Sequence, residues 1–216
     1  MIAASLGASG APLRVLCLGA HCDDLEIGCG GTILRLLAER PGSTVRWEVF
    51  AGDGERASEA RSSAADFLAA AGRAQVEINS FRESYFPFVG AQIKDRFEQI
   101  KAEVEADLIF TPRTEDLHQD HRIIGELTWN TFRDHLIAEY EIPKYEGDLG
   151  QPNVFAPLSR AIAQRKIELV LRHFQSQAGR RWFRAETFES LMRLRGIECN
   201  AAEGFAEALY VRKLLL

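Results

Sequence analysis

Short apolar runs alternate with amphipathic segments along the first half of the chain. The runs have the length of buried strands and are bounded by Gly-rich or charged turns. The expected strands cover residues 14–20, 44–50, 74–78 and 108–111. The expected helices, with apolar positions at helical spacing, cover residues 28–40, 57–71 and 93–104. Repeated strand–helix alternation predicts an α/β fold with a mainly parallel sheet and helices on both faces.

The second half of the chain is less regular. We expect helices over residues 127–139, 157–175 and 186–195, and a final strand with a polar tail over 206–216. A loop rich in Pro, Gly and polar residues is expected over 141–155. At this chain length the segments are additions to a single domain over 13–216, preceded by a loose arm over 1–12.

Charge and cysteine usage narrow the function classes. The chain has 26 Lys and Arg against 31 Asp and Glu, a formal net charge of −5. This balance argues against non-specific nucleic-acid binding and against docking on anionic membrane. No apolar run reaches the roughly 18 residues of a membrane helix. Four cysteines without a Cys-x-x-Cys pair fit reduced thiols in a cytoplasmic protein.

Polar residues that commonly bind metals follow two of the expected strands. Residues 20–26 read Ala-His-Cys-Asp-Asp-Leu-Glu, and residues 111–121 contain His-Gln-Asp-His at their end. Three of the five histidines in the chain lie in these two segments. In open α/β sheets, ligands bind beyond the carboxyl ends of strands. The topology therefore predicts that both segments contribute to one site.

These residue types can meet the requirements of a hydrolytic zinc site. Such a site needs three His or carboxylate ligands, an open position, a separate carboxylate base and a donor for the oxyanion. His21, Asp24 and His121 can supply the ligands. Asp23 then remains as a base, and His118 lies on a similar side to His121 if both are helical. Asp120 can orient His118.

Simpler interpretations exist for parts of this pattern. An adjacent Asp pair after a strand is often a helix N-cap followed by a first-turn acid. The glycines at 28, 30 and 31 resemble a weak dinucleotide fingerprint but lack the G-x-G-x-x-G order. Close packing of a helix against the sheet explains them better.

The combined motifs resemble those of the PIG-L/LmbE family of zinc-dependent de-N-acetylases. The similarity rests on Ala-His-x-Asp-Asp-x-Glu, then Gly-x-Gly-Gly-Thr, and a distal His-x-Asp-His. Arg195-Gly196 and residues 205–209 resemble late segments of the same family, so the resemblance spans about 14–212. It implies a Rossmann-like three-layer sandwich and hydrolysis of an acetamide on an amino sugar.

The resemblance also implies roles for individual residues. One Zn²⁺ per chain, or another divalent transition metal, would be held by His21, Asp24 and His121. Asp23 would be the general base. His118, oriented by Asp120, would stabilise the oxyanion and protonate the leaving amine.

Other positions leave alternatives open. Cys22 stands where the family usually has proline, and it is either a spacer or a soft metal ligand. Arg56, in Arg-Ala-Ser-Glu, and Arg61 compete for the position of the family's Arg-x-x-Glu, as candidates for substrate binding. Glu83 and Tyr145 are candidates for contacts with sugar hydroxyls. The aromatic residues at 81, 85, 86 and 88 are expected in the core.

The function expected from these observations is hydrolysis of an N-acetyl group on a soluble amino sugar or sugar conjugate. The partner is then a small-molecule substrate, with no nucleic acid or membrane, and a monomer and a homo-oligomer both fit the sequence. The alternatives are another metal-dependent hydrolase, such as a phosphoesterase, and a non-catalytic nucleotide-binding module.

Overall fold

A seven-stranded sheet forms the centre of the molecule. The computed structural model describes residues 6–8 and 10–214, so part of the expected arm over 1–12 lies outside the described residues. The strand order is β3-β2-β1-β4-β5-β7-β6. The strands are β1 (Arg14–Gly19), β2 (Thr44–Val49), β3 (Arg73–Ile78), β4 (Leu108–Pro112), β5 (Ile137–Tyr140), β6 (Val154–Leu158) and β7 (Phe205–Tyr210).

The sheet is mainly parallel, as the alternating pattern predicts. β1 pairs in parallel with β2 and β4, and parallel pairing continues outward to β3 and β5. β7 alone runs antiparallel, between β5 and β6. The chain leaves β1 toward β2 on one side and returns to β4 on the other. The carboxyl ends of β1 and β4 are therefore the switch point, where α/β folds form their ligand sites.

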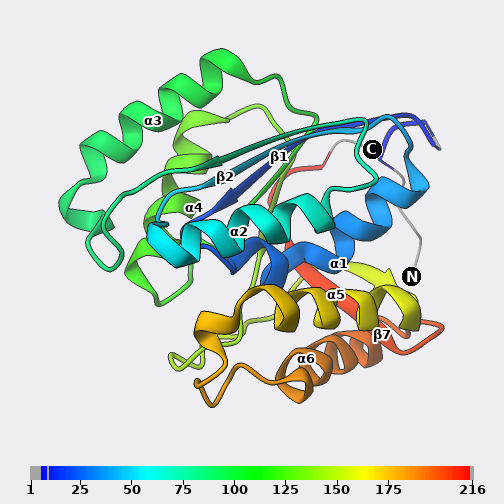
Figure 1. Cartoon of the computed structure of the whole chain (residues 1–216). Coiled ribbons are helices and arrows are strands. Elements are labelled where there is room, and N and C mark those ends of the chain that lie inside the picture. The colour runs from blue at the N-terminus through cyan, green and yellow to red at the C-terminus, as the bar shows by residue number, and fades with distance from the viewer. Residues whose placement is uncertain (1–5, 9, 215–216) are drawn as a thin grey trace.

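Helices cover both faces of the sheet (Figure 1). One layer holds α1 (Asp24–Glu39), α2 (Gly54–Phe67), α5 (Arg160–His173) and α6 (Ala185–Glu198). The other holds α3 (Gly90–Glu103) and α4 (Gln119–Thr131). Two short 3₁₀ turns, η1 (Phe86–Phe88) and η2 (Gln175–Gln177), complete the elements of the described residues.

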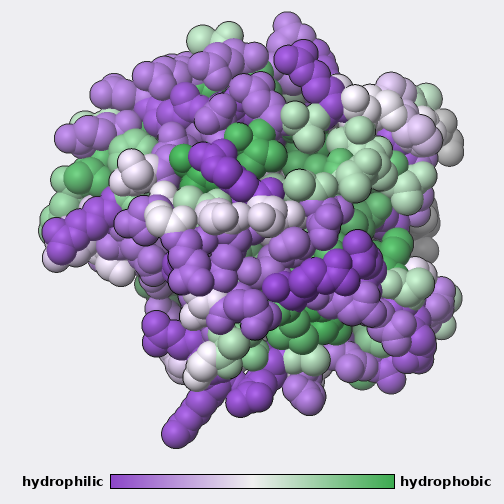
Figure 2. Space-filling model, viewed as in Figure 1, coloured by the Kyte–Doolittle hydropathy of each residue, from purple (hydrophilic) through white to green (hydrophobic). Residues whose placement is uncertain are grey.

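Side-chain alternation along β1 explains the two cores. Val15 and Cys17 belong to the cluster beneath α1 and α2, whereas Leu16 and Leu18 belong to the cluster beneath α3 and α4. Successive side chains of a strand point to opposite faces, so a continuously apolar strand fills both. The outer surface seen in Figure 2 is mostly hydrophilic, with smaller hydrophobic areas between the helices.

The glycines after the Asp pair lie inside α1, where they allow close packing. A Cβ on Gly28 would collide with the Tyr140 ring, and one on Gly31 would lie 2.6 Å from Leu158. The packing interpretation is therefore confirmed. The alternative, a dinucleotide-type turn, does not fit this segment, because residues 28–32 are helical rather than a loop before a helix.

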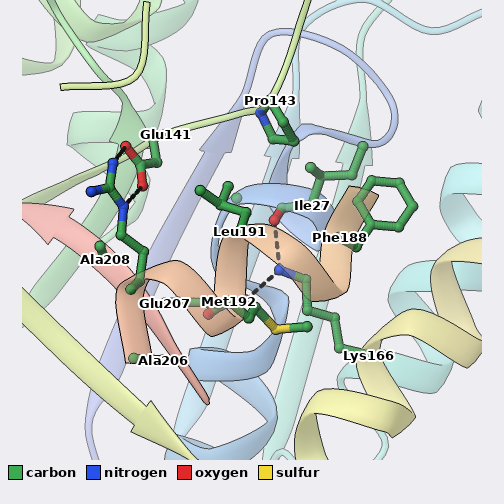
Figure 3. A pocket seen from close by; sticks show the side chains of 12 residues that line it. Ile27, Glu141, Pro143, Lys166, Phe188, Leu191, Met192, Ala206, Glu207 and Ala208 are labelled. Carbon is green, nitrogen blue, oxygen red and sulfur yellow. Dashed lines mark hydrogen bonds and ion pairs between the residues drawn. The ribbon is translucent and has the colours of Figure 1, made fainter. Parts of the chain in front are cut away.

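A buried charge network joins α1, α5 and β7 (Figure 3). Glu207 accepts hydrogen bonds from the backbone N–H groups of Gly31 and Thr32 at 2.9 and 2.6 Å. Lys166 lies 2.5 Å from Glu207 and donates to the Ile27 carbonyl at 2.6 Å. Nearby, Arg195 forms a two-pronged ion pair with Glu141. A buried carboxylate needs such complete pairing, so the network fixes how β7 docks on α1.

In the second half of the chain, the structure differs from the expected boundaries of three elements. The helix expected over 127–139 is wrong: α4 ends at Thr131, and Ile137–Tyr140 is the buried strand β5. No Gly or Pro separates the two, so their apolar residues read as one run. The helix expected from 157 begins at Arg160, after edge strand β6, where Pro157 lies. The final strand ends at Tyr210, and residues 215–216 of the expected polar tail lie outside the described residues.

None of the described helices has both the length and the apolar character required to cross a membrane.

Candidate metal and catalytic site

The two polar segments meet at the carboxyl ends of β1 and β4. His21 follows β1 in the turn that leads into α1, and Asp24 is the first residue of that helix. His118 is the N-cap of α4, and His121 lies in its first turn. Because β1 and β4 are neighbouring parallel strands, their exits lie side by side. The topology thus joins residues about a hundred positions apart in one buried cluster.

Three side-chain atoms converge at the centre of this cluster. Nδ1 of His21 lies 3.1 Å from Nε2 of His121. Oδ1 of Asp24 lies 3.3 Å from the same His121 nitrogen and 3.6 Å from Nδ1 of His21. Tetrahedral zinc with bonds near 2.0–2.1 Å places its ligand atoms about 3.3 Å apart. The three separations therefore fit a shared cation.

Each of these histidines contacts a carboxylate through its other ring nitrogen. Nε2 of His21 lies 3.1 Å from Oδ2 of Asp120, and Nδ1 of His121 lies 3.0 Å from Oδ2 of Asp116. Asp24 is held by the backbone N–H of His21, which donates to its Oδ2 at 2.8 Å. Carboxylates behind the ring are the usual supports of metal-binding histidines because they fix tautomer and orientation.

Sequence reasoning missed Asp116 and placed Asp120 on a different ring. Asp120 was expected to orient His118, but its carboxylate faces His21 and accepts the backbone N–H groups of Ser84 and Phe86. His118 and Asp120 instead interact through the backbone. Nδ1 of His118 accepts the Asp120 N–H at 3.3 Å as the cap of α4.

This capping bond determines what His118 can do chemically. An accepting Nδ1 places the proton of a neutral imidazole on Nε2, which leaves an N–H donor. Burial lowers the pKa of His118, and the nearby positive charges of His121 and His21 lower it further. A ring nitrogen of His118 also lies within 4.8 Å of one from each of the other two histidines. The position suits a hydrogen-bond donor, and a role as a fourth ligand would require His118 to give up its capping bond.

Asp23 is paired with an arginine rather than capping α1. It occupies the N-cap position and is only 6% exposed, but its side chain makes no capping bond. Arg56 of α2 donates to its Oδ1 at 3.1 Å and reaches Glu83 at 3.4 Å. Burial raises the pKa of Asp23, and the charge of Arg56 opposes this rise. The Asp pair is thus more than a helix-capping feature.

Of the other four candidate residues, two line a hollow beside the site and two do not. Arg56 and Glu83 line a hollow of about 330 Å³ beside Asp23, between the ends of β2 and β3. Arg61 is exposed on α2 and does not line this hollow. Tyr145 lies in the loop after β5 and is 77% exposed.

Cys22 is turned into the core between the site and α2. Its thiol donates to the Ala51 carbonyl at 3.4 Å, and the residue is 1% exposed. Burial raises the pKa of Cys22 to about 12, so it is a neutral thiol near pH 7. Among the aromatic residues after β3, the expected core position is confirmed for Phe86, which is fully buried, and is wrong for Tyr85 and Phe88, which are 40% and 77% exposed.

The charges around the ring cluster favour a cation. Burial acts to lower the pKa of His21, but Asp24 and Asp120 outweigh it and raise the pKa to about 10. Burial likewise opposes the rise at His121, where Asp24 and Asp116 raise the pKa to about 9. Burial alone would raise the pKa of Asp24, yet the two histidines hold it well below its usual range. Positive charge, whether protons or a metal ion, therefore stabilises this cluster.

The model of the PIG-L family, described as GlcNAc-PI de-N-acetylase, matches residues 16–132. This stretch is more than half of the chain and contains both polar segments. The chain belongs to the PIG-L family. No curated protein sequence matches the chain.

Solved structures share the fold of this PIG-L family member over most of its length. The conserved protein TT1542 from Thermus thermophilus has a TM-score of 0.74 at 19% identity, covering 94% of this chain and 96% of that one. N,N'-diacetylchitobiose deacetylase from Pyrococcus horikoshii has a TM-score of 0.71 at 20% identity, covering 92% and 83%. GalB, the 4-carboxy-2-hydroxymuconate hydratase from Pseudomonas putida, has a TM-score of 0.69 at 15% identity, covering 94% and 98%. These identities establish the α/β fold alone.

Proposed function

We propose that this PIG-L family member is a metal-dependent hydrolase that removes an N-acetyl group from an amino sugar or sugar conjugate. The observation that carries the proposal is the convergence of His21 Nδ1, His121 Nε2 and Asp24 Oδ1 next to the buried base candidate Asp23. The family match supports the reaction class, and the polar hollow beside Asp23 supports a hydrophilic substrate.

The ligand set fits one zinc ion per chain. His21, Asp24 and His121 offer two imidazole nitrogens and one carboxylate oxygen, a donor set typical of hydrolytic zinc. Zinc bound there would polarise the acetamide carbonyl and lower the pKa of water toward ~7. Cys22 directs its thiol to Ala51, which supports a spacer role rather than a ligand role.

Asp23 is the proposed general base. It takes a proton from the attacking water as the water oxygen forms a bond to the acetyl carbon. Burial raises the pKa of Asp23 and therefore its basicity, while the charge of Arg56 opposes this rise and favours the ionised form. A base in this position typically contributes about 10²–10⁴ in rate.

His118 is the proposed donor opposite the base. Its Nε2–H can hydrogen-bond to the oxygen that gains negative charge when the tetrahedral carbon forms. The carbon–nitrogen bond then breaks, and the amine leaves with the proton that Asp23 took from the water, because a neutral His118 that gave up its Nε2 proton would become an imidazolate. The products are acetate and a free amine, so atoms and charges balance.

The remaining contacts define the proposed substrate side. Arg56 and Glu83 can exchange hydrogen bonds with sugar hydroxyls in the hollow next to Asp23. Asp53 and Arg82 line the same hollow and add an acceptor and a donor. This mixture of charges suits a neutral, hydroxyl-rich group better than an acyl chain.

A phosphoesterase is the competing proposal. Phosphoester hydrolysis often uses two metal ions ~3.5–4 Å apart, which requires a second ligand set. Within residues 6–8 and 10–214, the side chains with metal-site spacing, namely the three histidines and Asp24, all belong to this one cluster. This supports amide hydrolysis at a single ion.

The experiment that tests the proposed function compares wild type with Asp23→Asn. The variant should bind zinc like wild type but lose about 10²–10⁴ in kcat on an N-acetylated amino sugar, because it lacks only the base. Zinc is measured by metal analysis and turnover by amine release. Full turnover in Asp23→Asn would contradict the proposed mechanism.

A further inference from the structure

A lysine from the loop after β5 contacts the carboxylate that supports His121. Nζ of Lys144 lies 2.9 Å from Oδ2 of Asp116. The same Oδ2 atom lies 3.0 Å from Nδ1 of His121. The Asp116 side chain is 3% exposed and that of Lys144 is 12% exposed. One buried oxygen therefore joins the loop lysine to the imidazole at the candidate metal site.

A second carboxylate holds Lys144 in this position. Oδ1 of Asp148 lies 2.5 Å from Nζ of Lys144, and its Oδ2 accepts the backbone N–H of Leu117 at 2.6 Å. The Asp148 carbonyl also accepts a hydrogen bond from Arg113 at 3.1 Å. Asp148 thus ties the loop to the segment that precedes His118. The ammonium group of Lys144 is therefore held between the carboxylates of Asp116 and Asp148.

The loop is fastened at its other points as well. Arg195 pairs with Glu141, where the loop begins (Figure 3). It also donates to the Gly150 carbonyl at 3.1 Å. The Gly150 N–H donates to the Tyr210 hydroxyl at 3.2 Å. Lys144 therefore reaches Asp116 from a loop that is held by hydrogen bonds at both of its ends.

We propose that Lys144 is a positioning residue that acts through Asp116 to orient His121 for metal binding. The inference rests on the proposed function, because it assumes that His121 is a ligand. The His118 N–H donates to Oδ1 of Asp116 at 2.8 Å, whereas Lys144 and His121 share Oδ2, so the lysine holds Oδ2 toward the ring. Without the lysine, Oδ2 of this nearly buried carboxylate keeps one partner fewer and can shift away from Nδ1. The His121 ring then loses its fixed orientation, and metal affinity falls.

The test is a double-mutant cycle read out as zinc affinity, measured by competition with a chromophoric chelator. Wild type, Lys144→Met, Asp116→Asn and the double variant are compared. Loss of a carboxylate behind a metal-binding histidine typically lowers affinity about 10–100-fold, which we expect for Asp116→Asn. We expect a smaller, several-fold loss in Lys144→Met, of the order seen for a coupled pair. The double variant should match Asp116→Asn, because the lysine acts only through that carboxylate.

Two further measurements separate positioning from general stability. Lys144→Arg keeps the charge and should restore zinc affinity, and the cobalt(II) absorption spectrum should change in Lys144→Met but not in Lys144→Arg. Lys101→Met removes an exposed lysine on α3 and should leave both readouts unchanged. If Lys144→Met does not fold, Lys144→Gln replaces it in the same cycle.

The outcomes distinguish this inference from the proposed function. Wild-type zinc affinity and an unchanged cobalt spectrum in Lys144→Met would overturn the role of Lys144 and leave the metal site intact. Losses that add fully in the double variant would also overturn it, because Lys144 would then act by another route. If wild type itself binds no zinc, the proposed function fails, and the inference fails with it.

Discussion

Nδ1 of His21 and Nε2 of His121 lie 3.1 Å apart, although 100 positions separate the two residues in the chain. Two imidazole nitrogens at this distance share either a proton or a metal ion. Asp24 completes a triangle with them, and a carboxylate stands behind each ring. The arrangement explains why a buried polar cluster is stable at the end of an apolar sheet.

Removal of any one of these three side chains should abolish zinc binding. His21→Ala, Asp24→Ala and His121→Ala each delete one of three ligands, so each purified variant should lack stoichiometric zinc. Metal analysis after dialysis checks this. His173→Ala is the matched control. His173 lies on α5, outside the cluster, and pairs with Asp66 of α2 at 2.9 Å. Full zinc content in two of the three variants would refute the ligand set.

His118 has two functions that different substitutions can separate. It caps α4, and loss of a cap typically costs about 0.5–2 kcal/mol of stability. His118→Ala should lose both the cap and most of the turnover. His118→Asn keeps a capping side chain and should keep the stability, but it should still lose about 10²–10⁴ in kcat.

Thermal unfolding and kinetics of the two His118 variants are read side by side, together with zinc content. Retained zinc in both variants supports the donor role. Zinc loss in both would show instead that His118 is a fourth ligand.

Arg56 should set the acid limb of the pH–rate profile. Burial raises the pKa of Asp23 and Arg56 lowers it, so Arg56→Met should raise that pKa further. The base works only when ionised, and the acid limb of kcat/KM should therefore move to higher pH. Arg56→Lys keeps a positive charge and should shift it less. An acid limb that stays in place in Arg56→Met would show that Arg56 does not influence the pKa of Asp23.

Zinc binding should release protons and strengthen as the pH rises. Without metal, the pKa of His21 is raised to about 10 and that of His121 to about 9, and their two facing nitrogens share one proton near pH 7. Zinc must displace this shared proton, so its affinity should rise by up to roughly 10-fold per pH unit until the pH approaches 9. Calorimetry in buffers of different ionisation enthalpy counts the protons.

The same pKa shifts determine how the stability of the metal-free protein changes with pH. Both pKa values lie above the unfolded value near 6.5, so the stabilisation is fully present below that pH. It is lost as the pH rises through about 9 and 10. Zinc affinity that is independent of pH between 7 and 9 would contradict a shared proton between the two histidines.

The location of the site could be predicted from the sequence, because it follows from topology. Apolar strands followed by His and Asp identify two strand exits, and a parallel sheet brings such exits to one edge. The supports of the ligands could not be predicted in the same way. His118 was treated as helical, but its backbone is extended as an N-cap (φ −70°, ψ 119°), so its ring does not follow helical spacing.

The turn before α4 explains the remaining differences. Asp116 and Asp120 are equivalent acids by sequence, and only the path of that turn places one behind His121 and the other behind His21. Strand β5 was missed for a related reason. Its four residues follow α4 without Gly or Pro and take strand form because they pair with β4.

The most direct test of the central claim is release of acetate and amine from a panel of soluble N-acetylated amino sugars, nucleotide sugars and sugar conjugates. The protein is assayed after zinc loading, after chelation, and after zinc is restored. The proposed function predicts equimolar acetate and free amine from at least one member, loss of turnover on chelation and recovery with zinc. Equal turnover in the loaded and chelated protein, or hydrolysis of phosphoesters with no amine released from any panel member, would contradict it.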